Sequence, residues 1–375
     1  MATSQGKQAQ EKITSWANKE GEFKRLPSTF RSHIEKGGQF PPEKGRYMLY
    51  VSYACPWAHR ALIVRQLKGL GDFVDVSVVH PHMGAMGWSF YPPIRGEDGE
   101  YPATTGETGP DDGIGGVIPD PLYGAKFARD LYFRAEKTYE GRFTVPILWD
   151  KKAETIVNNE SSEIIRMFNT EFNSELPSNF AALDLYPTAL RDDIEAQNSW
   201  VYDTVNNGVY KSGFATSAKA YEANVHPLFE SLEKLEKILE GGKKFVVGDV
   251  MTEADVRLFT TIVRFDPPDR SSHLQTYLTS NATLVPSATT YVQSLRNFVS
   301  KLTPMPFPRF PQFPNLNHWQ KNLYYNYPAF KDTTNFEHIK HHYFTSHPQI
   351  NPTRIVIDLF PSRQPVGPLP AIEPL

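Results

Sequence analysis

The sequence has only one cysteine, Cys55, among 375 residues. A lone cysteine excludes an intramolecular disulfide framework and any zinc or iron–sulfur site that needs several thiolates. It does not exclude a reactive thiol, although an isolated cysteine is more often a small buried apolar residue. The role of Cys55 therefore depends on the residues around it.

Long apolar runs and an excess of charge of one sign are also lacking. No stretch approaches the ~20 apolar residues that span a bilayer. The first residues are polar, unlike a secretory signal, and Glu11 and Glu20 speak against a mitochondrial presequence. The formal net charge of -3 gives no long-range attraction to nucleic acid or an anionic membrane. We therefore expect a cytoplasmic protein with neither a nucleic-acid nor a membrane partner.

The first half of the chain alternates strand and helix patterns. After a polar N-terminal arm, residues 1–43, the order is strand, helix, strand, long excursion, strand, strand and helix. The excursion, 91–124, is rich in Gly, Pro, Asp and Thr and is too long for an ordinary connection. The expected elements are strands at 47–51, 74–79, 144–148 and 155–157, and helices beginning at Pro56 and after Asn159. This order indicates one α/β domain over residues 44–172.

The second half shows helical periodicity. Apolar residues recur at helical spacing from about Leu190, and Gly208 marks an irregularity or a helix end. Thr252-Glu-Ala-Asp255 is typical of a capping box that starts a helix. We expect an all-helical domain over residues 183–347, interrupted by a Pro-rich insert at about 267–314 and followed by a tail, 348–375.

Cys55-Pro-Trp-Ala-His-Arg60 follows a predicted strand and opens a helix. Pro56 suits the first helical position, which makes Cys55 the N-cap. Its sulfur would face free backbone N–H groups and the positive end of the helix dipole, which favour the nucleophilic thiolate. His59 and Arg60 lie nearby in the sequence and could add positive potential. Because no second cysteine exists, an outside thiol, glutathione or another small thiol, must resolve any mixed disulfide on Cys55.

A second predicted helix start could hold a peptide-like ligand. In Asn159-Glu-Ser-Ser162, Ser161 and the first-turn N–H groups could bind a carboxylate, and Glu160 an ammonium group. The γ-glutamyl end of glutathione presents both groups. Taken alone this segment is an ordinary helix cap, but together with the thiol helix and Val145-Pro146 it indicates a peptide cradle.

Several long motifs, in order, carry a family resemblance: Cys55 to Arg60, Gly87-Trp-Ser-Phe90, Gly141 to Asp150, Asn159 to Asn169, Val205 to Tyr210, Thr252 to Asp255, Arg264-Phe-Asp-Pro267 and Ile339-Lys-His-His-Tyr343. They resemble the glutathionyl-hydroquinone reductases, the Xi class of glutathione transferases, related to the Omega class. The match runs from about Gly45 to Pro267 and resumes from Asn317 to Pro352.

The resemblance implies a thioredoxin-like N-terminal domain, a helical glutathione-transferase C-terminal domain, and a homodimer with no permanently bound cofactor. It implies that Cys55 attacks the sulfur of a glutathionyl-hydroquinone and that a second glutathione then releases oxidised glutathione. By position, Tyr210 matches a tyrosine that transfers a proton to the aromatic substrate, and Tyr343 one that hydrogen-bonds near the thiol. The implied glutathione contacts are Trp88, Arg142, Phe143, Thr144, Val145, Pro146, which is cis in thioredoxin-like layers, Glu160 and Ser161.

The sequence departs from the family pattern after Pro267, where Asp269 occupies the place of a second tyrosine near the thiol. Two other functions stay open: an Omega-like thioltransferase or dehydroascorbate reductase that uses Cys55 on other substrates, and a non-catalytic glutathione- or aromatic-binding protein, which the missing tyrosine and the insert make plausible. Without the motifs, Tyr210 and Tyr343 would be read as buried aromatics among 18 tyrosines. The helically spaced histidines 338, 341, 342 and 347 could ligate a metal, but a solvated helix face is the simpler interpretation, and we expect no metal.

Overall fold

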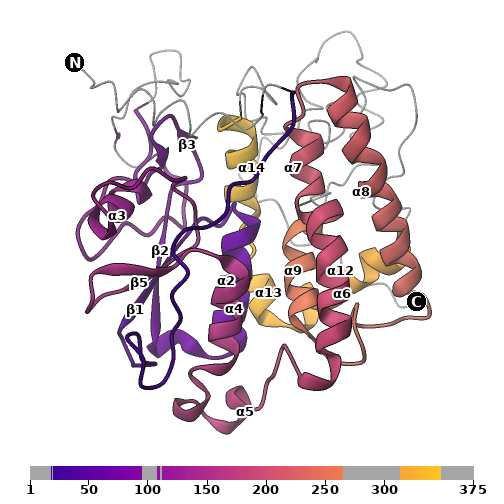
Figure 1. The fold of residues 1–375 in the computed structure, drawn as a ribbon, viewed down its shortest axis with the longest axis horizontal. Helices are drawn as coiled ribbons and strands as arrows, with labels where there is room; N and C mark the ends of the chain where they lie inside the picture. The colour runs from indigo at the N-terminus through magenta and orange to yellow at the C-terminus, as the bar shows by residue number, and fades with distance from the viewer. Residues whose placement is uncertain (1–17, 19, 95–107, 110–111, 265–312, 348–375) are drawn as a thin grey trace.

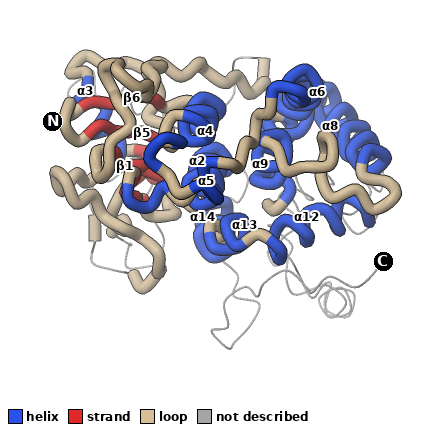
Figure 2. Tube along the Cα trace, turned by 90° about the horizontal axis from the view of Figure 1, so that it is seen from below, coloured by secondary structure: helices blue, strands red, loops and turns tan. Residues whose placement is uncertain are grey.

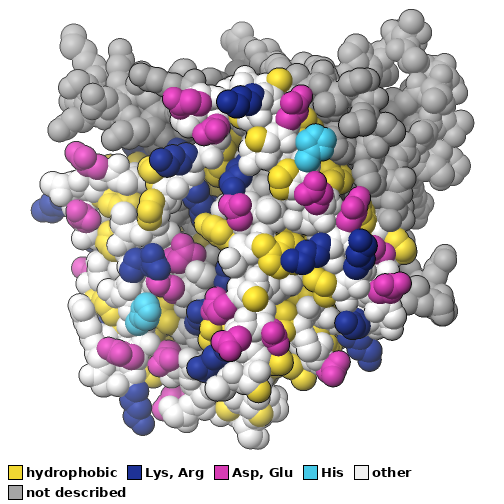
Figure 3. Space-filling model, turned by 45° about the vertical axis from the view of Figure 1, so that its right-hand side comes forward, with side chains coloured by type: hydrophobic (Ala, Val, Ile, Leu, Met, Phe, Trp, Pro, Cys, Tyr) yellow, Lys and Arg dark blue, Asp and Glu magenta, His cyan; other side chains and the backbone are white. Residues whose placement is uncertain are grey.

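The computed structural model describes residues 18, 20–94, 108–109, 112–264 and 313–347. Asp269, nearly all of the predicted insert and the tail lie outside these ranges. Within them, no helix is both long and apolar enough to cross a bilayer. On the face shown in Figure 3, lysine and arginine side chains are interspersed with aspartate and glutamate.

A four-stranded sheet forms the centre of the N-terminal domain, with the order β2-β1-β5-β6. Its strands are β1 (Tyr47–Val51), β2 (Val74–Val78), β5 (Ile147–Asp150) and β6 (Thr155–Asn158). β1 runs parallel to β2 and antiparallel to β5, and β5 runs antiparallel to β6. Every residue of β1 is buried, which explains its unbroken apolar sequence. This topology confirms the predicted thioredoxin-like fold.

Helices cover this sheet on two sides. α2 (Pro56–Leu67) and α4 (Ser161–Thr170) pack together on the side that faces the second domain, and α3 (Ala128–Ala135) lies on the other side (Figures 1 and 2). A short hairpin, β3 (Met83–Gly84) and β4 (Gly87–Trp88), follows β2. Neither α3 nor this hairpin was predicted from the sequence. β5 begins later than the predicted Thr144, because the ladder starts only after Pro146, which lacks an N–H group.

The C-terminal domain is helical, as predicted. It contains α6 (Arg191–Val201), α7 (Gly208–Gly213), α8 (Ala218–Ile238), α9 (Glu253–Ile262), α12 (Pro314–Asn326), α13 (Pro328–Asp332) and α14 (Phe336–Thr345), and the short α5 (Ser178–Ala181) precedes them. The irregularity expected at Gly208 is a π-helical turn, Tyr202–Asn206, between α6 and α7. The capping box is confirmed, since Thr252 and Asp255 cap α9, and Trp319 Nε1 of α12 donates to Asp255 Oδ1 at 3.0 Å.

Buried polar contacts join the two domains. α2 packs against α9 and α13, and His59 of α2 lies 2.9 Å from the Thr333 hydroxyl after α13. Arg60 donates to Asn206 Oδ1 at 2.9 Å. The boundaries between residues 43 and 44 and between 172 and 183 stay predictions.

The described part of the N-terminal arm crosses from one domain to the other. Thr216 N–H of the helical domain donates to the Gly21 carbonyl at 3.0 Å, and Asn159 N–H after β6 donates to the Phe30 carbonyl at 3.1 Å. Between these points the indigo segment in Figure 1 runs across the front of the molecule. The arm therefore contacts both domains.

Candidate active site

Cys55 opens α2 beside a cavity of about 650 Å³. The residue has extended backbone angles, and Pro56 occupies the first helical position, so Cys55 is the N-cap as predicted. Its side chain is partly exposed, because the sulfur faces this cavity. Eight predicted site residues line the cavity: Cys55, Trp88, Arg142, Phe143, Thr144, Val145, Tyr210 and Tyr343. Pro146, Glu160 and Ser161 are not among its lining residues.

The surroundings of the Cys55 sulfur act in opposite directions on its pKa. Burial raises the pKa of the thiol, and this is the largest influence. The backbone N–H groups of Ala58 and Trp57 and the guanidinium charges of Arg264 and Arg25 lower it. The net direction is upward, opposite to the prediction from the helix start alone, because removing a thiolate from water outweighs these favourable groups.

His59 and Arg60 do not supply the positive potential predicted for them. Burial lowers the pKa of His59 far below its usual value, so the ring is neutral, and it contacts Thr333 and Arg264. The Arg60 guanidinium packs against the Trp57 ring, 4.4 Å from its centroid. The cations that act on the sulfur come instead from the N-terminal arm and from the end of α9.

Arg264 ties the helical domain to the residues before the thiol. Its guanidinium, just after α9, donates to the carbonyls of Tyr53 at 2.8 Å and Ala54 at 3.0 Å, and to the Thr260 carbonyl of α9 at 2.7 Å. The side chain is buried, with 4% of its surface exposed. The sequence motif that contains Arg264 marked the family but gave no role to this residue.

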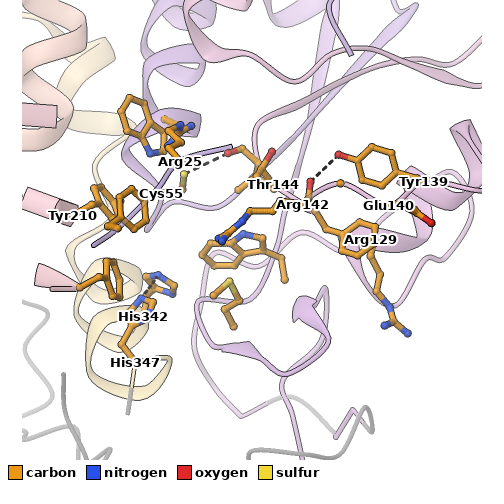
Figure 4. Close-up of a pocket in the computed structure, with 18 of the residues that line it drawn as sticks. Arg25, Cys55, Arg129, Tyr139, Glu140, Arg142, Thr144, Tyr210, His342 and His347 are labelled. Carbon is orange, nitrogen blue, oxygen red and sulfur yellow. Dashed lines mark hydrogen bonds between the residues drawn. The ribbon is translucent and has the colours of Figure 1, made fainter. Parts of the chain in front are cut away.

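The segment opposite the thiol presents backbone groups to the cavity. The Val145–Pro146 peptide bond is cis, as predicted, and the Cys55 thiol lies 3.5 Å from the Val145 carbonyl oxygen. The Tyr132 hydroxyl fixes this segment, since it donates to the Thr144 carbonyl at 2.8 Å and accepts from the Thr144 N–H at 3.2 Å. Arg142, labelled in Figure 4, and Phe143 line the same cavity.

Glu160 and Ser161 lie at the start of α4, beneath the arm. Glu160 is the N-cap, and its carboxylate accepts from the Ser162 N–H at 3.2 Å and from the Ser28 hydroxyl at 3.0 Å. These hydrogen bonds help to hold the pKa of Glu160 below its usual value although burial opposes them, so the side chain is an anion. The Ser161 hydroxyl accepts from Arg60 at 3.5 Å.

Tyr210 of α7, labelled in Figure 4, and Tyr343 of α14 both line the cavity, and their hydroxyl oxygens lie 3.3 Å apart. Burial raises the pKa of both hydroxyls, so both are protonated at neutral pH. The contact predicted between Tyr343 and the thiol is not among the hydrogen bonds of the described residues, although the sulfur acts electrostatically on both tyrosines.

Several cavity residues were missed by the sequence analysis: Phe23, Arg25, Met83, Phe214, His342 and His347. His342 stacks on Trp88 with ring centroids 4.7 Å apart, and its Nε2 lies 3.2 Å from His347 Nε2. The predicted solvated histidine face is wrong, because His338, His342 and His347 are buried. No group of three or more His, Cys, Asp or Glu side chains in the described residues is arranged to hold a metal.

Comparison with known proteins agrees with this geometry. The glutathione S-transferase N-terminal domain matches residues 54–171, and the C-terminal domain matches 218–319. The crystal structure of glutathione transferase Xi from Phanerochaete chrysosporium is 51% identical, covers 94% of this chain and 100% of its own, and superposes with a TM-score of 0.74. The chain belongs to the Xi class of glutathione transferases.

Two further relatives of this Xi-class transferase extend the comparison. Glutathione S-transferase omega-like 2 of Schizosaccharomyces pombe is 46% identical over 96% of this chain and 98% of its own length. Glutathionyl-hydroquinone reductase YqjG of Escherichia coli is 43% identical over 90% of this chain and 88% of its own. A glutathione-bound structure of YqjG is 42% identical over 88% of this chain and 92% of that chain, with a TM-score of 0.70.

Proposed function

We propose that this Xi-class transferase reduces glutathionyl-hydroquinones to hydroquinones, with glutathione as co-substrate. The observation that carries the proposal is the position of the Cys55 sulfur, at a helix start, 3.5 Å from the Val145 carbonyl and in one cavity with the Tyr210–Tyr343 pair. The backbone at Val145 and the rings of Tyr210 and Tyr343 thus line the same cavity as a single thiol. The reductase name of a 43% identical relative supports the same reaction.

The first chemical step forms a disulfide and breaks a carbon–sulfur bond. The Cys55 thiolate attacks the sulfur of the conjugate, and the electron pair of the broken bond goes to the aromatic ring carbon, which takes up a proton. Hydroquinone leaves, and Cys55 remains as a mixed disulfide with glutathione. A second glutathione attacks this disulfide, which regenerates the Cys55 thiol and releases oxidised glutathione.

The tyrosine pair suits the proton transfer. Because burial raises the pKa of Tyr210, its hydroxyl keeps its proton at neutral pH and can donate it to the ring carbon. Tyr343 lies within hydrogen-bonding distance and can stabilise the charge that develops on Tyr210. Trp88, the run from Arg142 to Pro146, Glu160 and Ser161 would hold glutathione.

The test is the release of hydroquinone from a glutathionyl-hydroquinone with excess glutathione. We expect Cys55→Ser to abolish release and Tyr210→Phe to lower kcat by about 100-fold or more while glutathione still binds. Val250→Ala, at an exposed position that is not among the lining residues of the cavity, is the control. Release that persists in Cys55→Ser would refute the thiol mechanism. If wild type releases no hydroquinone but reduces simple mixed disulfides, the chain is a thioltransferase, and glutathione binding without turnover indicates a binding protein.

We also propose that the protein works as a homodimer in the cytoplasm without a permanently bound cofactor. The resemblance to the family supports the dimer, and the proposed use of reduced glutathione supports the location, because glutathione keeps cytosolic thiols reduced. Light scattering of the purified protein would show twice the mass of one chain, and fractionation of cells would recover it with cytoplasmic markers. A monomer, or recovery with an organelle, would contradict the respective proposal.

A further inference from the structure

The N-terminal arm holds Arg25 above the cavity between two anchors. On the helical side, Ser217 Oγ donates to the Glu20 carbonyl at 3.3 Å, and Thr216 N–H donates to the Gly21 carbonyl at 3.0 Å. On the sheet side, Ser28 Oγ donates to Glu160 at 3.0 Å. Arg25 lies between these anchors, so its position is set by both domains.

Arg25 shares an aromatic ring with a second arginine. Its guanidinium carbon lies 4.0 Å from the centroid of Trp57, and that of Arg60 lies 4.4 Å from the same ring. Arg60 is 1% exposed and reaches the Ser161 hydroxyl at the start of α4. Figure 4 shows Arg25 beside Cys55 on the wall of the cavity. Packing on an indole leaves the edge of a guanidinium able to donate hydrogen bonds.

Arg25 and Arg142 both line this cavity. Burial is the largest influence on the pKa of Arg60, Arg142 and Glu160, and the charge of Arg25 lowers the pKa of all three, which places these groups within its electrostatic reach. Arg25 thus lies within electrostatic reach of the Glu160 carboxylate. A ligand that brings an ammonium group to Glu160 and a carboxylate to Arg25 would neutralise both charges.

We propose that Arg25 binds the α-carboxylate of the γ-glutamyl group, so that the N-terminal arm completes the glutathione site. The ammonium group and this carboxylate share one carbon atom, so a ligand whose ammonium contacts Glu160 carries its carboxylate close by. Arg25, from above, and the start of α4, from below, enclose that position. The inference rests on glutathione being the co-substrate and does not depend on which conjugate is reduced.

The test compares binding of three peptides to the Cys55→Ser protein, which cannot form mixed disulfides. Calorimetry would use glutathione, γ-aminobutyryl-Cys-Gly, which lacks the α-carboxylate, and glutathione amidated at glycine. We expect Arg25→Gln to weaken glutathione binding about tenfold or more, since a charge-assisted hydrogen bond is lost. The same substitution should leave the affinity for γ-aminobutyryl-Cys-Gly unchanged, and Arg25→Lys should restore part of the loss.

Lys24→Gln is the matched control, because Lys24 is an exposed cation on the same arm. It should bind all three peptides as the parent does, and thermal melting would confirm that each variant is folded. If Arg25→Gln weakens γ-aminobutyryl-Cys-Gly as much as glutathione, Arg25 only fixes the arm. If the amidated peptide alone becomes insensitive to the substitution, Arg25 binds the glycyl carboxylate. Either result overturns the proposal, whereas failure of the parent to bind glutathione would remove the proposed function itself.

Discussion

Arg264 and Arg25 are the charges that favour the Cys55 thiolate against burial. The pKa of the thiol is raised overall, so the thiolate fraction, and with it the rate of the first step, should increase as pH rises through neutrality. Each cation that is removed should shift this dependence further toward alkaline pH. The sequence places neither residue near the thiol, since both are distant from Cys55 along the chain.

We expect Arg264→Met to shift the pH profile of Cys55 alkylation by iodoacetamide to higher pH. Arg264→Lys, which keeps the charge, should shift it less. Arg65→Met is the control, because Arg65 is a cation of α2 that donates to the Val74 carbonyl rather than toward the thiol. Circular dichroism would confirm folding, and a profile that does not move would show that Arg264 only holds the Tyr53 and Ala54 carbonyls.

The candidate site could be predicted where its chemistry is local. Cys55 with Pro56 and the start of α4 each follow from a few consecutive residues, whereas the cis bond at Val145 was expected only from the resemblance to the family. His59 and Arg60 were misjudged because proximity along a helix does not say which face of it meets the other domain. Phe23 and Arg25 carry no local signal at all, because only the path of the arm brings them to the cavity.

At the level of the element, α14 packs its histidines inward. Burial lowers the pKa of His338, His341 and His342 to about 4, well below the usual 6.5. The His338 ring lies 2.8 Å from the Gly115 carbonyl, His80 lowers its pKa further, and Asp112 opposes this effect. The unfolded chain therefore binds more protons than the folded one between pH 6.5 and 4. The stability that these neutral rings provide is present above pH 6.5 and is lost as pH falls toward 4.

We expect His338→Gln to reduce this acid sensitivity, since glutamine can still donate to Gly115 but does not titrate. Between pH 7.5 and pH 5 the free energy of unfolding should fall in both proteins. The fall should be about 2 kcal/mol smaller in the variant than in wild type. Urea denaturation at both pH values measures this difference. His33→Gln, at an exposed histidine of the arm, should behave as wild type. Equal losses in all three proteins would show that His338 is not buried as a neutral ring.

Elements with strong periodicity or caps could be predicted, such as α8 from its apolar stripe and α9 from Thr252 and Asp255. α3 was missed because it has only eight residues and follows a long loop. The solvated face assigned to α14 was wrong because histidine is compatible with either environment, and only packing against the Pro81 carbonyl and Trp88 decides it.

At the level of the whole molecule, the two domains share buried polar groups. The Arg264 hydrogen bonds to Tyr53 and Ala54 and the Arg60 hydrogen bond to Asn206 would lose their partners if one domain opened alone. An unpaired buried guanidinium is costly. We therefore expect one cooperative unfolding unit.

Native-state hydrogen exchange tests this expectation. The slowest amides of β1, in the sheet, and of α8, in the helical domain, should exchange with free energies that agree within about 1 kcal/mol. Arg60→Met should lower both values together, and Lys237→Met, on α8 away from the interface, should leave both unchanged. If the free energy of the opening that exposes the β1 amides were several kcal/mol lower than that for α8, the two domains would unfold independently.

The cavity draws its walls from residues near opposite ends of the chain, since Phe23 and Tyr343 both line it. About 320 residues separate the two, and at ~5–20 residues per second a ribosome adds them over roughly 15–65 s. During that interval the thioredoxin-like domain can emerge with its thiol while α14 does not yet exist. A chain released before α14 is made would carry the nucleophile but would lack His342 and Tyr343 of the cavity. The complete site therefore forms only when synthesis is nearly finished.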